Sequence, residues 1–315
     1  MLTYDLINKN KRESWLLIFI FLIIISALGF IFAQVYNNSA ILYFAVGFSI
    51  FSSLISYYFS DSITLALSKA QAVDRNTNQQ LYNIVENLCI AAGLPTPRIY
   101  IIDDTAPNAF ATGRDPKHAV VCVTTGILQK LEKTELEGVI AHELSHIGNY
   151  DIRVMTLVVV LVGTITLLAD WFMRASFFGG RRSYDREGGQ LKTILMIAGL
   201  ILAILSPIIA TLIKLAVSRK REYLADASGA LLTRHPEGLA RALEKISADT
   251  EPLEAANKAT AHLYIVNPFH EDRGPSSALD GLRTTSAEGR SWFAKMFNTH
   301  PPVEDRIAKL RNMNL

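Results

Sequence analysis

Residues 134–147 read TELEGVIAHELSHI, and the rest of the chain is best interpreted outward from this stretch. Thr134 and Glu137 have the spacing of a capping box, which predicts that a helix begins here. Positions four residues apart lie on one face of a helix, so His142 and His146 can direct their imidazole rings at one metal ion. The stretch therefore predicts a metal-binding helix.

His142, Glu143 and His146 together form the HExxH pattern. Zinc in hydrolases usually has three protein ligands and one open position for water. A glutamate beside the ligands accepts the proton of this water as the water attacks a carbonyl group, and Glu143 is the candidate for this base. The alternative is a pair of histidines, solvated or buried in the core, that lie one helical turn apart without a metal. The pattern predicts a hydrolase with one zinc ion per chain.

A third zinc ligand must come from another part of the chain. Glu222 and Asp226 lie four residues apart in a stretch of helical character, so their carboxylates share one face. One of them could bind the metal while the other accepts the N–H of a metal-binding histidine. Spacing alone is equally consistent with a solvated helix face that balances three nearby cations, Arg219, Lys220 and Arg221.

The first 60 residues have the composition of a membrane segment. Between Ser14 and Ser60 there is no Asp, Glu, Lys or Arg, and two apolar blocks cover residues 15–33 and 40–59. Each block has about 20 residues, which is enough for a helix to cross the roughly 30 Å of hydrocarbon in a bilayer. We expect residues 1–60 to form a transmembrane hairpin. The alternative is a helical hairpin buried in a soluble protein.

Two further apolar segments, Val154–Met173 and Thr193–Val217, bring the expected number of transmembrane helices to about four. Asp170 interrupts the first segment and Lys214 interrupts the second. The alternative for residues 154–217 is therefore a hairpin that dips into the membrane or packs on the polar domain.

Lys9, Lys11 and Arg12 precede the first apolar block and predict a cytoplasmic N-terminus, because positive charge is retained on the cytoplasmic side. The hairpin then returns the polar part of the chain to the cytoplasm. Residues 174–192 carry five basic and two acidic residues, and they would lie outside if both later segments cross, against the same tendency. Glu222 can reach the two histidines only if residues 154–217 cross the membrane an even number of times, which is two or zero.

The polar regions, residues 61–153 and 218–315, have a mixed pattern that predicts a mostly helical α+β catalytic domain with a small sheet. Apolar spacing together with start and stop signals favours helices at 78–92, 136–147, 219–232, 236–247 and 303–313. Alternating or continuous apolar runs favour strands at 98–102, 108–112 and 118–124.

Charge and cysteine content limit the class of protein. The chain has 31 basic and 29 acidic residues and a net charge of +2, which gives no reason to expect nucleic acid as a partner. The apolar content of 50% and the mean hydropathy of +0.23 favour a membrane protein. Cys89 and Cys122 form neither a CxxC pair nor a disulfide framework, so we expect buried thiols in a reducing compartment.

With these motifs in this order, the chain resembles the HtpX-type membrane metallopeptidases, which are relatives of the CAAX prenyl endopeptidase. The resemblance covers nearly the whole chain. It is carried by the apolar hairpin, Asn108-Ala109-Phe110-Ala111-Thr112-Gly113, the HExxH helix, the two later apolar segments, Ser218–Asp226, and His300-Pro301-Pro302 with Arg306. It implies a zincin of the gluzincin type, with Glu222 as third zinc ligand, Glu143 as general base and Asp226 as the carboxylate behind a metal-binding histidine.

The resemblance also suggests roles for three other residues. Asn108 begins a strand that lines the substrate cleft, where an extended peptide adds by main-chain hydrogen bonds; a plain turn residue is the alternative. His300 lies near the metal and stabilises the oxyanion, or else it only leads into the last helix. Arg306 pairs with a carboxylate of the site, or else it is solvated.

The resemblance implies a zinc endopeptidase of the cell inner or plasma membrane, with its catalytic domain in the cytoplasm. It further implies a role in stress response and in quality control of misfolded membrane proteins. One rival is a dedicated processing peptidase of CAAX type, which is disfavoured because that relative has more membrane spans and a large enclosed chamber. The other rival is a non-catalytic zinc-containing membrane scaffold, whose zinc would have four protein ligands. Neither composition nor spacing indicates an oligomeric state.

Overall fold

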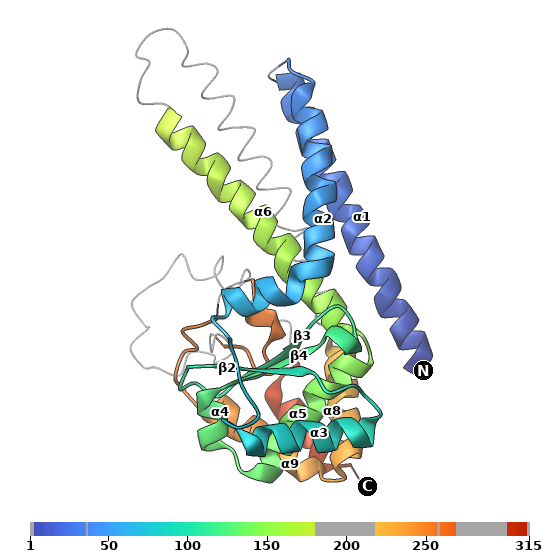
Figure 1. The fold of residues 1–315 in the computed structure, drawn as a ribbon, viewed down its shortest axis with the longest axis vertical. Helices are drawn as coiled ribbons and strands as arrows, with labels where there is room; N and C mark the ends of the chain where they lie inside the picture. The colour runs from blue at the N-terminus through green and yellow to red at the C-terminus, as the bar shows by residue number, and fades with distance from the viewer. Residues whose placement is uncertain (1–2, 36, 180–217, 257–258, 269–300, 314–315) are drawn as a thin grey trace, which may run out of the picture.

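The structure, a computed structural model, describes residues 3–35, 37–179, 218–256, 259–268 and 301–313. Long helices project from one end of a rounded domain that contains a small sheet (Figure 1). These helices are α1 (Thr3–Val35), α2 (Ala40–Leu67) and α6 (Asp151–Gly179).

Helices α1 and α2 form the predicted hairpin. Each contains a stretch that is long and apolar enough to cross a membrane, Ile7–Gln34 and Ala40–Leu67. Large apolar side chains such as Phe44, Phe51 and Phe59 are exposed along α2, as expected of a surface that faces lipid rather than water. Both helices extend beyond the predicted apolar blocks, because a helix does not have to end where the hydrocarbon ends.

The predicted segment at 154–173 is part of α6, which leaves the domain in the same direction as the hairpin (Figure 1). The run Asp151–Ile165 qualifies as a span only together with Lys133–Gly148, from which it is bent by 83°. The predicted segment at 193–217 lies outside the described residues. In the described part of the chain, two helices, or up to three, have the length and composition of a span, and a total of about four stays a prediction.

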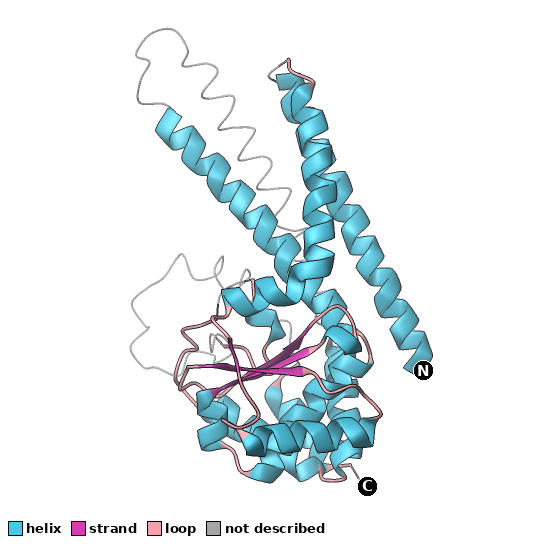
Figure 2. Ribbon diagram, viewed as in Figure 1, coloured by secondary structure: helices cyan, strands magenta, loops and turns pink. Residues whose placement is uncertain are grey.

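The sheet has four strands in the order β1-β2-β4-β3 (Figure 2). Strands β2 and β4 are parallel, whereas β1 pairs antiparallel with β2 and β3 pairs antiparallel with β4. The strands are β1 (Gln71–Ala72), β2 (Arg98–Ile102), β3 (Ala109–Thr112) and β4 (Val120–Thr124). All three predicted strands are present. The last of them begins at residue 120 rather than 118, because the chain before it forms a 3-10 turn whose N-cap is Asp115.

Helices cover the sheet and form most of the domain (Figure 2). They are α3 (Gln79–Ala92), α4 (Thr125–Lys130), α5 (Lys133–Gly148), α8 (Arg219–Thr233), α9 (Pro236–Ala248) and α11 (Val303–Arg311), with the 3-10 turns η1 (Pro116–His118) and η2 (Ala261–Leu263). The ends of α3 show why the helix prediction succeeded. The side chain of Asn78 accepts a hydrogen bond from the N–H of Leu81, and Gly93 ends the helix with a φ of 66°, which glycine adopts without strain.

The capping box of α5 consists of Glu132 and Glu135, so the predicted pair Thr134 and Glu137 was wrong. The carboxylate of Glu135 accepts a hydrogen bond from the N–H of Glu132 at 2.8 Å and one from the ammonium group of Lys245 in α9 at 2.7 Å. Glu135 is buried, and a buried carboxylate requires such partners. The glutamate of this cap thus also bonds a helix that is distant in the sequence.

Helix α5 is the centre of the domain core, where it contacts α3, α8, α9 and β3. Glycines let two of these neighbours approach its backbone closely. A Cβ atom at Gly138 would lie 2.7 Å from the backbone nitrogen of Leu239 in α9. A Cβ atom at Gly229 of α8 would lie 3.0 Å from the backbone nitrogen of His142. The second close approach brings α8 directly onto the HExxH motif.

Gly138→Ala should destabilise the domain by about 1–3 kcal/mol, because the added methyl group meets the backbone of α9 and forces two helices apart. Gly148→Ala in the same helix is the matched control. Its Cβ atom would lie 3.6 Å from a side-chain carbon of Leu94, an ordinary contact, so higher helix propensity should preserve or raise stability. Unfolding of both variants in detergent micelles would check this. Equal effects at the two positions would contradict the packing described for α5 and α9.

Candidate metal and catalytic site

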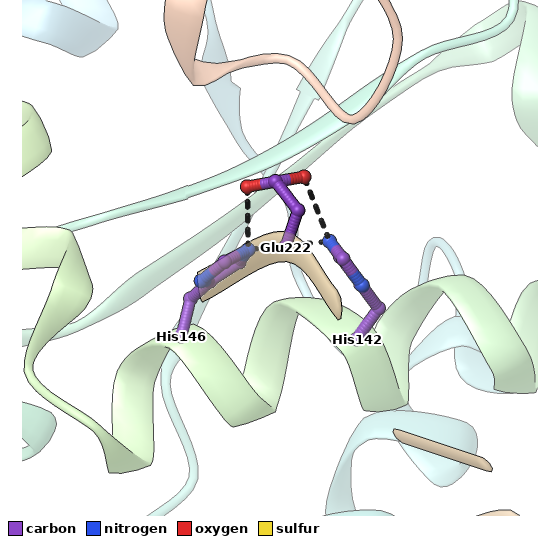
Figure 3. Close-up of side chains that lie close together, drawn as sticks. All are labelled: His142, His146 and Glu222. Carbon is purple, nitrogen blue, oxygen red and sulfur yellow. Dashed lines mark hydrogen bonds and ion pairs between the residues drawn. The ribbon is translucent and has the colours of Figure 1, made fainter. Parts of the chain in front are cut away.

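Helices α5 and α8 bring His142, His146 and Glu222 together (Figure 3). One ligand atom from each residue lies within 4.8 Å of the other two. Both imidazole rings rise from one face of α5 toward the carboxylate, which belongs to α8. The three side chains are buried, with exposed fractions of 1%, 3% and 2%. Buried polar groups need polar or charged partners, and a metal ion at the point where these three converge would be one.

The distances among the ligand atoms fit a small coordination sphere. Nε2 of His142 lies 3.2 Å from Nε2 of His146 and 3.9 Å from Oε2 of Glu222, and Nε2 of His146 lies 3.5 Å from Oε1 of Glu222. Ligands roughly 2.0–2.2 Å from a tetrahedral ion lie about 3.3–3.6 Å from one another. Two imidazole nitrogens and one carboxylate oxygen are also the donor set typical of zinc in hydrolases. The residues present therefore fit a zinc ion.

Carboxylates behind the two rings determine which nitrogens can bind a metal. Nδ1 of His142 lies 2.9 Å from Oδ1 of Asp226, and Nδ1 of His146 lies 3.0 Å from Oδ2 of Asp151. A carboxylate beside Nδ1 favours a proton on that nitrogen and leaves a lone pair on Nε2. Two lone pairs and the Glu222 carboxylate then face one point, and a cation at that point removes their mutual repulsion.

The pKa values of neighbouring groups reflect this excess of negative charge. Burial alone lowers the pKa of His146, but Asp151 and Glu222 raise it to about 9, so the surroundings of this ring favour a cation. Burial raises the pKa of Glu143 to about 7. Glu143 lies on α5, which packs against strand β3.

Asp151 is a residue of the site that the sequence prediction missed. It opens α6 directly after the metal-binding helix, and Tyr150 between the two helices has a φ of 62°. This left-handed backbone is uncommon for residues other than glycine and turns the chain sharply. The carboxylate of Asp151 thereby returns to His146. The sequence signal is an acidic residue five positions after the second histidine, but this spacing becomes meaningful only through the turn.

Arg306 of α11 is buried against the carboxylate of Asp226. Its Nε and Nη2 atoms donate to the two oxygens of Asp226 at 2.9 and 2.7 Å, and its Nη1 atom donates to the carbonyl of Ile265 at 2.9 Å. Burial alone raises the pKa of Asp226, but Arg306 lowers it to about 2. Of the two alternatives for Arg306, the structure has the ion pair, and only 1% of the arginine is exposed.

Asn108 is buried at the start of β3 and forms its hydrogen bonds within the protein. Its Nδ2 atom donates to the carbonyl of Val266 at 3.0 Å, and its Oδ1 atom accepts from the N–H of Ala109 at 3.1 Å. The N–H of Ile265 donates to the carbonyl of Ala109 at 3.0 Å. Asn108 therefore helps to attach a segment that follows α9 to the edge of the sheet. His300, the other residue suggested for substrate or oxyanion contact, lies outside the described residues.

Comparison with known proteins gives consistent matches. The chain matches Peptidase family M48 over residues 75–314. It is 45% identical over 311 residues to a "Protease HtpX homolog" of Dictyoglomus turgidum, which covers 98% of this chain and 94% of the relative. A protein of the same description from Tropheryma whipplei (strain Twist) is 42% identical, over 98% of this chain and 98% of the relative. Another, from Caldanaerobacter subterraneus subsp. tengcongensis, is 43% identical, over 99% of this chain and 98% of the relative. Among solved structures, the crystal structure of S. mikatae Ste24p is 18% identical, with a TM-score of 0.48 over 89% of this chain and 61% of that chain.

Arg306→Met should lower the stability of the domain by about 3–5 kcal/mol, because it leaves the buried charge of Asp226 without its guanidinium partner. Arg311→Met in the same helix is the matched control, since Arg311 makes its ion pairs with Glu237 and Glu244 at the surface. That change should leave the midpoint of thermal unfolding nearly unchanged. Similar losses in the two variants, measured by thermal unfolding in detergent, would rule out a special role for the buried pair.

Proposed function

The chain belongs to peptidase family M48 and is a membrane-associated metalloprotease, and on this premise we propose that it hydrolyses peptide bonds with one zinc ion held by His142, His146 and Glu222. Glu143 is the proposed general base. Asp226 and Asp151 are the proposed carboxylates that orient the two histidines.

The convergence of two Nε2 atoms and one carboxylate at a single buried point carries this proposal. Each histidine has a carboxylate behind Nδ1, which is the usual arrangement for imidazole rings that bind zinc. Among the described residues, three side chains converge as metal ligands rather than four. Three protein ligands favour an open catalytic site over the closed site of a zinc-containing scaffold.

A zinc ion held by these side chains would lower the pKa of a water molecule and polarise the substrate carbonyl. Glu143 lies on α5 between the two histidines, where it is placed to accept the proton of the attacking water. It can then give that proton to the leaving amine. Burial raises the pKa of Glu143 above that of a free carboxyl, and a group that takes up and releases a proton works best when its pKa is near the ambient pH.

Strand β3 is the proposed platform for substrate. It is an edge strand of the sheet and lies against α5. The outward N–H and C=O of Ala109 already bond Asn108 and Ile265, so an extended peptide would add by main-chain hydrogen bonds to the part of the edge that follows Ala109. Asn108 would fix the start of this strand through its bond to Val266. His300 stays the proposed donor to the oxyanion, and Arg306 acts through Asp226.

We propose that the catalytic domain faces the cytoplasm and acts on misfolded membrane proteins. Lys9, Lys11 and Arg12 at the start of the hairpin support this orientation. The first turns of α6 and the helix α8 both pack in the domain, which supports an even number of crossings between them. The domain also lies at the base of the helices that would enter the bilayer (Figure 1), which supports a role in membrane-protein quality control.

Glu143→Gln and Glu222→Ala should separate proton transfer from metal binding. Glu143→Gln should bind one zinc ion per chain but lose cleavage of a model protein substrate by at least about a hundredfold, because an amide cannot accept the proton. Glu222→Ala should lose both zinc and cleavage, since it removes a ligand. Glu137→Gln, on the same helix as Glu143, is the control and should retain both. If zinc-loaded Glu143→Gln cut the substrate at the parent rate, the assignment of the base would be wrong.

The orientation can be tested by labelling cysteines in intact cells. Ser39→Cys lies in the exposed turn between α1 and α2, and Lys117→Cys lies on the exposed surface of the domain. A maleimide that cannot cross membranes should label Ser39→Cys in intact cells but Lys117→Cys only after permeabilisation. The reverse pattern would place the domain outside the cytoplasm.

A further inference from the structure

One face of α1 packs against the domain and α6, and it carries an unexpected amide. Buried positions recur along this face every three or four residues and include Asn10, Ser14, Leu17, Phe21 and Ile25. The hydroxyl of Ser14 donates to the carbonyl of Asn10 within the helix, at 2.8 Å. The side chain of Asn10 is 2% exposed, and a buried amide is costly unless it forms hydrogen bonds.

Asn10 finds its partners at the junction between α5 and α6. Its Nδ2 atom donates to Oδ1 of Asp151 at 2.7 Å and to the carbonyl of Asn149 at 2.8 Å. Both partners are acceptors, so the NH₂ group of the amide must point toward them. The first bond joins residues 141 positions apart in the sequence. It ties the first helix of the chain to the start of α6, directly after the metal-binding helix.

Asp151 divides its two oxygens between α1 and the metal site. Oδ1 accepts the bond from Asn10, and Oδ2 lies 3.0 Å from Nδ1 of His146. Asp151 is 2% exposed. The bond to Oδ1 therefore restricts the rotation of the carboxylate, and the carboxylate in turn sets the orientation of the imidazole ring.

A second residue of α1, Glu13, contacts α8, the helix that carries the proposed ligand Glu222. Glu13 forms an ion pair with Nη2 of Arg221, whose Nε atom lies 3.4 Å from Oδ1 of Asp151. Arg221 directly precedes Glu222 in α8. Helix α1 thus contacts both chain segments that carry the proposed metal ligands.

We propose that Asn10 is a positioning residue for the metal site. By holding Asp151, it fixes the imidazole of His146, so a helix that would span the membrane helps to set the affinity of the protein for zinc. This inference rests on the proposed function, because it requires that His146 binds the metal. Since α1 is one continuous helix, a shift of its membrane part would also move Asn10 relative to Asp151.

Asn10→Leu in the full-length protein should weaken zinc binding about tenfold, the lower end of the effect expected when the support of a metal-binding histidine is removed. Leucine has nearly the shape of asparagine and keeps the buried face filled; Asn10→Ala is the second variant and should show the same loss. Asn8→Ala, at an exposed position of the same helix, and Ser14→Ala, on the buried face, are controls and should bind zinc as the parent does. Competition with a zinc-chelating dye in detergent measures the affinity without reference to cleavage.

A double-mutant cycle distinguishes positioning from general damage. If Asn10 acts through Asp151, Asn10→Leu should cause no further loss of zinc affinity in a protein that already carries Asp151→Ala. The inference would be overturned if Asn10→Leu left the zinc affinity unchanged. It would also be overturned if Asn10→Leu lowered the affinity equally in the parent and in Asp151→Ala. A loss of affinity that only follows a lower unfolding midpoint of the metal-free protein would overturn it as well. If the parent protein itself bound no zinc through Glu222, the proposed function would fail instead.

Discussion

Four carboxylates are buried at one place in this protein, and the rest of the site follows from the need to compensate their charge. Glu143, Asp151, Glu222 and Asp226 are at most 4% exposed. Removing such groups from water is strongly unfavourable unless cations or hydrogen-bond donors replace the solvent. The Nδ1 N–H groups of the two histidines, which face Asp226 and Asp151, and the guanidinium group of Arg306 supply part of this compensation. A divalent cation between the imidazole rings and Glu222 would supply the remainder.

The two histidines receive support from opposite ends of the chain. Behind His142, Asp226 is held by Arg306 of α11, the last described helix. Behind His146, Asp151 is held by Asn10 of α1, the first helix. The close approach of α8 at its glycine brings the third proposed ligand over both rings. The site therefore depends on α8, which packs onto α5, and on α1, which bonds the turn after α5 and also has the length and composition of a membrane span.

Features that depend on local sequence could be predicted, whereas those that depend on distant contacts could not. The HExxH helix, the N-terminal hairpin and the end of α3 at Gly93 follow from spacing, composition and the conformational preference of glycine. The pair Glu222 and Asp226 was also visible, because residues four apart share a helix face. Asp151 is not separated from His146 or Asn10 by a helical spacing. Its contacts with them become apparent only once the turn at Tyr150 and the packing of α1 are known. The cap of α5 was predicted at Thr134 and Glu137, whereas the structure has Glu132 and Glu135, and Glu135 also bonds a lysine of the distant helix α9.

X-ray absorption at the zinc edge of the purified full-length protein tests the central claim most directly, because it reports the ligand atoms themselves. We expect two imidazole nitrogens at about 2.0–2.1 Å, with oxygen completing a coordination number near four and no sulfur in the first shell. A spectrum with a sulfur ligand or with more than two imidazole rings would contradict the site built from His142, His146 and Glu222. The absence of stoichiometric zinc would contradict it as well.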